Sequence, residues 1–230
     1  MRHIRVLAAL IDMTGLTASP AFHPLRHAAA GALCAAAWRV LPGYAAASLL
    51  LSAVLTQVVA TAAASYDLSH LALEAMLRVY VVELLPLAAA VFVAMRSGLT
   101  ALAVLPPRRV GLTQLRHAIL PTLIGHSIAV ASLTLISIVL ALLIVYPVVH
   151  GFAPWGLPAY TRLIGQVFDP VTALVLIWKV LMFGLAIGLL PALAAITRHA
   201  DRVGGETRAL ALLLAGLVAI ELIALAVLRI

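Results

Sequence analysis

Long apolar stretches without a formal charge are the feature that most constrains how this chain folds. Between Arg116 and Arg162 there is no Lys, Arg, Asp or Glu, and the stretch from Val40 to Tyr66 also lacks them. A transmembrane helix needs about 20 consecutive apolar residues, so each stretch is long enough to cross a membrane. Of the 230 residues, 65% are apolar and 10% are charged, which leaves no room for a separate soluble domain. The sequence therefore predicts a polytopic membrane protein.

The predicted fold class is an all-α membrane protein of about five transmembrane helices preceded by an N-terminal interfacial helix. Strand-type alternation is absent, and runs of this length favour helices over a barrel. An Ala-rich segment over 28–41 has the basic and aromatic residues of an interfacial helix, so 1–44 is assigned to a cytoplasmic or interfacial segment and 45–230 to the transmembrane domain. The density of prolines and aromatic rings predicts a structured loop at the membrane surface over 146–169. The spans are predicted at about 45–64, 79–95, 119–145, 171–196 and 209–228.

The basic residues predict the orientation of these spans. Eleven arginines fall in the N-terminal segment and in the connections after the second and fourth spans, against three on the other side, Arg78, Arg162 and Arg229. Because cytoplasmic loops carry the excess of basic residues, the N-terminus is expected in the cytoplasm and the C-terminus in the periplasm. The net charge of +7 is then a property of cytoplasmic loops, and a nucleic-acid partner is not expected.

Three ionisable residues fall inside predicted spans: Glu83, Lys179 and Glu221. Each costs about 2.5–3.5 kcal/mol at a helix centre, so each is expected to face a cavity or a partner. Pro86 can break the helix beside Glu83, and small-residue packing at Gly184 can bring another helix close to Lys179. A functional cavity is the preferred interpretation for Glu83 and Lys179, whereas for Glu221 a structural ion pair or a position near a helix end is equally consistent.

No motif for catalysis or for a metal site is present. The sequence has no Walker A, HExxH or GxSxG pattern, and the lone Cys34 excludes a disulfide within one chain. His23 and His27 have helical spacing, but Pro24 separates them and no third ligand is near, so a metal site is not expected. His126 is interpreted as a hydrogen-bonded interior residue.

Two segments resemble the MlaE-type permeases of lipid-transporting ABC systems. The second span of that family reads R-E-L-G-P and ends in A-G-R-V-G; here Glu83, Pro86, Arg96 and Gly98 match, while Val82 replaces the family arginine. The stretch 179–184, K-V-L-M-F-G, is similar to K-x-x-x-F-G in the fourth span of the family. The resemblance runs in the right order from about residue 40 to the C-terminus and includes a glycine-rich turn at 202–205 and a last span with a glutamate where an aspartate is usual.

The resemblance implies a homodimer that moves phospholipid, maintaining outer-membrane lipid asymmetry or envelope lipid traffic. Each copy would bind a cytoplasmic ATPase that carries the ATP and Mg²⁺, with an MCE-domain lipid-binding protein on the periplasmic side; no cofactor is expected in this chain. An acid near the fourth-span lysine is also usual, and Asp169, ten residues before it, is the nearest candidate along the chain. The residues expected to bind lipid or to gate its passage are Glu83, Arg96, Lys179 and Glu221.

The connection between the second and third spans departs from the family. Over 100–117 it is shorter than the family helix that docks on the ATPase, it is basic, and it contains Pro106 and Pro107. The ATPase-coupling contact is still expected here, at Arg108, Arg109, Gln114 and Arg116. Two alternatives stay open: a proton-coupled secondary carrier in which Glu83, His126 and Glu221 titrate, and a degenerate structural or assembly subunit that keeps the fold without the coupling.

Overall fold

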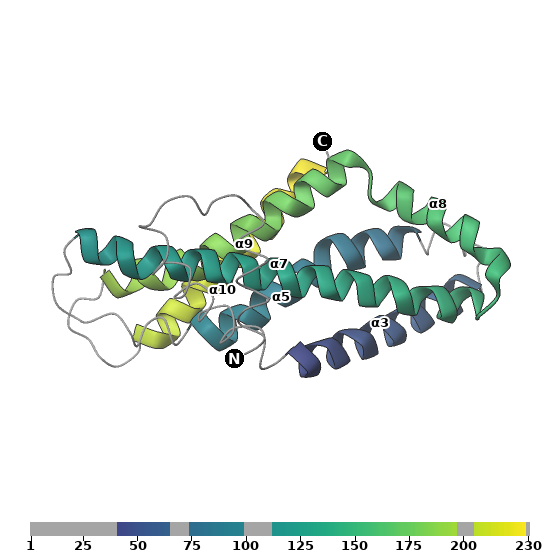
Figure 1. The fold of residues 1–230 in the computed structure, drawn as a ribbon, viewed down its shortest axis with the longest axis horizontal. Coiled ribbons are helices and arrows are strands. Elements are labelled where there is room, and N and C mark those ends of the chain that lie inside the picture. The colour runs from purple at the N-terminus through teal and green to yellow at the C-terminus, as the bar shows by residue number, and fades with distance from the viewer. Residues whose placement is uncertain (1–40, 65–73, 99–111, 197–204, 229–230) are drawn as a thin grey trace, which may run out of the picture.

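The computed structural model describes residues 41–64, 74–98, 112–196 and 205–228, which are helical apart from short connections (Figure 1). No strand occurs in these ranges, so the all-α class is confirmed. The elements in chain order are α3 (Leu41–Ala64), η3 (Arg78–Leu84), α5 (Leu85–Val93), η4 (Ala94–Gly98), α7 (Leu112–His150), η5 (Pro154–Gly156), α8 (Leu157–Val167), α9 (Pro170–Ile196) and α10 (Gly205–Leu228).

Five of the described helices are long and apolar enough to cross a membrane, and each overlaps one predicted span. The second of them begins with α-helical residues over 74–77 and continues through η3, α5 and η4 without a break. The predicted interfacial helix lies outside the described residues except for its last position, Leu41, where α3 begins. The five spans are Leu41–Ala63, Glu74–Arg96, Leu123–His150, Pro170–Pro191 and Leu210–Val227.

The second span is the centre of the bundle. Its most apolar window is 61% buried, against 17% for the outer spans in α3 and α10. It packs against α7, α9 and α10, while α3 packs along α7. Because lipid tails are as apolar as the side chains, packing and interhelical hydrogen bonds hold such helices together, and residues on the central span are the ones that several neighbours can reach.

Helices α7 and α9 approach each other closely, as the small residues predict. A Cβ placed on Gly184 would lie 2.3 Å from the Cα of Ser127, and one on Gly188 would lie 2.7 Å from a methyl carbon of Leu123. At Gly184 the contact is with backbone, so a side chain larger than hydrogen would force the two helices apart, whereas at Gly188 the leucine side chain would have to move. The expectation that another helix comes close at Gly184 is confirmed, and the neighbour there is α7; the hydrogen-bond partners of Lys179 lie on η3 and α10.

The segment expected as a surface loop is mostly helical, so the prediction for 146–169 was wrong in its structure. Helix α7 continues to His150, and after a turn at Gly151 (φ 65°) the chain enters η5 and α8. Pro154 and Pro158 stand in the first turns of those elements. A proline has no intrahelical bond to lose there and its fixed φ suits a helix start.

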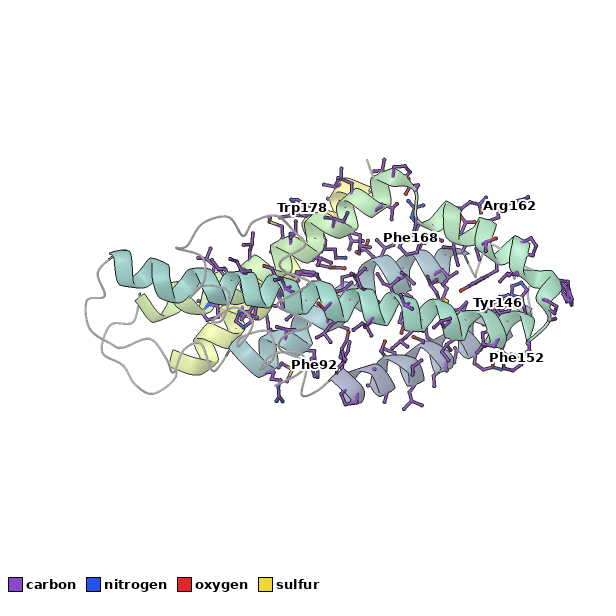
Figure 2. The ribbon with its side chains drawn as sticks, viewed as in Figure 1. Phe92, Tyr146, Phe152, Arg162, Phe168 and Trp178 are labelled. Carbon is purple, nitrogen blue, oxygen red and sulfur yellow. The ribbon has the colours of Figure 1, made fainter. Side chains whose placement is uncertain are left out.

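Helix α8 is attached to the end of α7 by a tyrosine. The Tyr160 hydroxyl donates to the Leu142 carbonyl at 2.7 Å, and burial raises the pKa of Tyr160 to about 12. The connecting turn carries two exposed rings, Phe152 and Trp155. Figure 2 shows Phe152 and Tyr146 at the α8 end of α7.

Candidate functional site

The three ionisable residues of the spans meet in one buried cluster. The Lys179 ammonium, on α9, donates to the carboxylate of Glu83 on η3 and, at 2.8 Å, to the carboxylate of Glu221 on α10. The exposed fractions are 0% for Lys179, 8% for Glu83 and 9% for Glu221. The expectation that each charge needs a partner inside the membrane is confirmed. We refer to these three residues as the charge cluster.

A third acceptor completes the surroundings of Lys179. Its Nζ also donates to the backbone oxygen of Val82 at 3.2 Å, and its ammonium lies 5.9 Å from the centre of the Phe183 ring. An ammonium has three N–H donors, and here each has an acceptor. Trp178, the preceding residue on α9, is by contrast partly exposed (Figure 2). All three N–H donors of Lys179 are therefore engaged by acceptors of this chain.

The local fold of the second span explains why the Val82 oxygen accepts from a side chain. In η3 the backbone bonds reach five residues back, ending with the Leu85 N–H to the Tyr80 oxygen. The next donor would be Pro86, which has no N–H, so the π register ends there and α5 begins. In an α register the N–H of residue 86 would serve the oxygen of residue 82. Proline at 86 has no such N–H, and the Val82 oxygen accepts from Lys179.

The charge cluster contains one basic and two acidic side chains. With both carboxylates ionised, one ammonium faces two negative charges, since Lys179 pairs with Glu83 and Glu221 alike. A buried ion group contributes little net stability, but loss of one member leaves an uncompensated charge and costs about 3–5 kcal/mol. The intact cluster therefore holds η3, α9 and α10 together, and loss of any one member destabilises the fold.

Other residues predicted for the site do not join the cluster. Arg96 is exposed on η4, roughly 20 Å along the same helix from Glu83 at 1.5 Å per residue. Asp169 caps α9 instead of meeting Lys179: its Oδ1 accepts from the Thr172 N–H at 3.0 Å. The Thr172 side chain and N–H hold the pKa of Asp169 below its usual range.

The predicted ATPase-coupling residues lie at the limits of the described residues. Arg108 and Arg109 lie outside the described residues. Gln114 and Arg116 lie in the first turns of α7, with side chains outside the described part. The coupling assignment therefore stays a prediction.

His126 is buried on α7, with 2% of its surface exposed. Its Nδ1 has no hydrogen-bond partner among the described residues, so the expected hydrogen bond is missing at that nitrogen. A donor or acceptor at Nδ1 would have to come from a group outside these ranges or from bound water.

Sequence reasoning missed a second polar feature, a line of hydroxyls on α3. Ser48, Ser52 and Thr56 are buried at four-residue intervals, and the Ser52 hydroxyl is 2.7 Å from that of Tyr80 on η3. One turn before Ser48, the hydroxyl of Tyr44 accepts from Ser137 of α7 at 3.1 Å. The four-residue spacing puts these side chains on one helix face, a signal that the sequence does contain.

Comparison with known proteins agrees with this architecture. The family model for the permease MlaE matches residues 32–227, a range that contains every described membrane span and the whole charge cluster. A search of curated proteins found no match. Permeases of this family are multi-pass inner-membrane subunits of ABC-type lipid transporters, are not themselves enzymes, and normally work with ATPase and MCE partners. The chain belongs to the MlaE permease family.

Proposed function

We propose that this chain is the membrane subunit of a phospholipid transport system of the bacterial envelope, in which the charge cluster acts as the gate. A separate ATPase chain supplies the ATP and Mg²⁺ chemistry, and an MCE-domain protein receives or delivers lipid on the periplasmic side. The system serves outer-membrane lipid asymmetry or related lipid traffic. The observation that carries the proposal is the convergence of Glu83, Lys179 and Glu221 from three spans, at positions where the family motif lies.

The cluster is better suited to gating than to holding a head group. All three donors of Lys179 are engaged by protein acceptors, so lipid phosphate can reach the ammonium only after one of these bonds opens. If the bond to Glu83 or to Glu221 opens, the ammonium gains a free donor and that carboxylate loses its partner at the same time. The cluster then has two separate states, one with the bond made and one with it broken. Arg96 is the proposed head-group contact, because a guanidinium binds a phosphate bidentately and this residue is exposed on η4.

The proposal includes a homodimer with the N-terminus in the cytoplasm and the C-terminus in the periplasm. In this orientation Arg108, Arg109, Gln114 and Arg116 lie on the cytoplasmic side, where the ATPase binds. A basic connection there fits an ATPase with an acidic docking surface. The outer helices α3 and α10 leave most of their surface uncovered, which provides faces for a second copy and for lipid.

A second candidate, a proton-coupled carrier, is favoured by one observation. Two carboxylates share one ammonium, and an excess acid inside a membrane is a common element of proton relays. This carrier would work without an ATPase and would respond to a pH gradient.

Purification in mild detergent, with mass spectrometry of all associated chains and lipids, is the first test. We expect a Walker-type ATPase, an MCE-domain protein and phospholipid to accompany the chain. The recovered complex is then placed in liposomes containing fluorescent phospholipid, and transport is followed with MgATP, without nucleotide, and with a pH gradient. Transport that needs MgATP supports the permease, and transport driven by the gradient alone supports the carrier. A chain that purifies without these partners and moves no lipid contradicts both.

The gate is tested with charge reversal at Glu83. We expect Glu83→Lys to abolish transport while the complex still assembles, because two ammonium groups would then face one carboxylate. Normal transport by this variant would refute the role of Glu83. Replacing Arg162, an exposed residue of α8, by Glu is the matched control and should leave transport unchanged.

A further inference from the structure

We propose that Pro86 is the positioning residue of the charge cluster, keeping the Val82 oxygen beside Lys179 by removing the N–H that would donate to this oxygen in an α register. Pro86 is buried, and the hydrogen bonds of Lys179 go to Val82, Glu83 and Glu221. Its action is indirect, through the oxygen four residues before it. The structural part of this inference stands on the geometry alone, and its consequence for lipid passage rests on the proposed function.

Lys179 donates to three acceptors on two neighbouring helices. Two of its three bonds go to neighbouring groups on η3, the Val82 oxygen and the Glu83 carboxylate, and the third goes to Glu221 on α10. With no exposed surface, Lys179 has no water to replace a lost acceptor. The Val82 oxygen therefore saturates the ammonium and also fixes its position beside Glu83.

An N–H at position 86 would allow a different helix register. Any residue other than proline at 86 could donate to Val82 in the α register, and the α-helix of α5 could then extend backwards through η3. Because a carbonyl oxygen can accept two hydrogen bonds, the added N–H does not by itself displace Lys179, but the change of register moves the Val82 oxygen and turns Glu83 relative to α9. π-helical segments inside longer helices occur frequently at functional sites, and here Pro86 marks the point at which the register changes.

The stability of Pro86→Ala in two backgrounds gives opposite expectations. A proline inside a helix ordinarily destabilises it, so Pro86→Ala should stabilise a chain in which proline has no other role. In the otherwise unchanged chain we expect the reverse, a Tm lower by about 2–4 °C, because the change of register carries the Val82 oxygen and the Glu83 carboxylate away from the Lys179 ammonium. In a background with an uncharged cluster (Glu83→Gln, Lys179→Met, Glu221→Gln) we expect Pro86→Ala to raise the Tm. Pro147→Ala, in α7 away from the cluster, is the matched control and should change both backgrounds equally.

A second readout follows Lys179 directly. Lys179 is the only lysine in the sequence, so an amine-reactive acetylating reagent followed by peptide mass spectrometry reports on this one side chain. We expect slow labelling in the unchanged chain and in Pro147→Ala, and labelling at least several-fold faster in Pro86→Ala. A proline that only shapes the helix would leave the labelling rate unchanged.

The Tm changes and the labelling rates together test the role of Pro86 without any transport measurement. A change of sign between backgrounds together with faster labelling supports it, and so does a Pro86→Ala chain that fails to fold only when Lys179 is present. The same Tm change in both backgrounds, failure to fold in both, or an unchanged labelling rate overturns it. A transport failure in the liposome assay would count against the proposed function and would leave these results standing.

Discussion

Replacing Lys179 by methionine keeps the volume of the side chain and removes the only cation of the charge cluster. Two carboxylates with exposed fractions of 8% and 9% then face each other without compensation. Removal of one partner from a buried ion group costs about 3–5 kcal/mol, and the Val82 oxygen loses its donor in addition, for about 1–3 kcal/mol. Since the carboxylates relax or take up protons, the two costs overlap, and we expect a loss of about 3–5 kcal/mol in the free energy of unfolding.

The assay is unfolding in mixed micelles of dodecyl maltoside and SDS, followed by far-ultraviolet circular dichroism at neutral pH. The decisive comparison is between Lys179→Met and the variant in which Glu83 and Glu221 are also replaced by glutamine. Because a neutral, well-packed replacement of a buried ion group is often as stable as the original, we expect the triple variant to recover most of the loss. A single variant that loses less than about 1 kcal/mol, or a triple variant as unstable as the single one, would refute the reasoning. Arg162→Met, an exposed site, controls for loss of a charge alone and should stay within about 0.5 kcal/mol.

Three further predictions concern helix packing and hydrogen bonds elsewhere in the bundle. Gly184→Ala should destabilise the bundle by about 1–3 kcal/mol, since its Cβ would lie 2.3 Å from a backbone atom of α7; Gly216→Ala, where the nearest atom is the end of a flexible leucine at 2.5 Å, should cost less in the same unfolding assay. Tyr80→Phe should cost about 0.5–1.5 kcal/mol through loss of the Ser52 hydrogen bond, and little further loss should follow in a Ser52→Ala background. Burial raises the pKa of Tyr160 from 10.0 to about 12, so its phenol stabilises the fold fully below pH 10, and this contribution should fall as the pH rises from 10 to about 12. Tyr160→Phe should remove that part of the alkaline loss, and an unchanged alkaline transition would contradict the assignment.

The membrane spans were predictable because a single physical requirement defines them. A bilayer demands about 20 apolar residues per helix, and the runs around 45–64 and 171–196 meet it without any knowledge of packing. The same requirement predicted that Glu83, Lys179 and Glu221 need partners, since an isolated charge inside a membrane is costly. It did not specify which partners, because the pairing depends on how η3, α9 and α10 pack, which the sequence pattern does not show.

Prolines account for both the main error and the main omission. Pro154 and Pro158 were interpreted as loop residues, whereas they stand at helix starts, and composition alone does not separate these two uses of proline. Pro86 was expected to break the helix beside Glu83, whereas the helix continues through it and changes from the π to the α register there. Its effect on Val82 could not be foreseen, since it becomes visible only once Lys179 from another helix occupies the freed oxygen.

The bonds around Lys179 indicate which of its ion pairs is held by fewer bonds. Two bonds tie α9 to η3 and one ties α9 to α10. Helix α10 nevertheless packs along α9, where a Cβ on Gly216 would lie 2.5 Å from the side chain of Leu190. Separating the whole of α10 from α9 would therefore break this packing, whereas a movement of the Glu221 side chain alone breaks one bond and leaves the two helices together. If lipid passes beside the cluster, the opening that breaks the fewest bonds is at the Glu221 carboxylate, and Glu83 stays with Lys179.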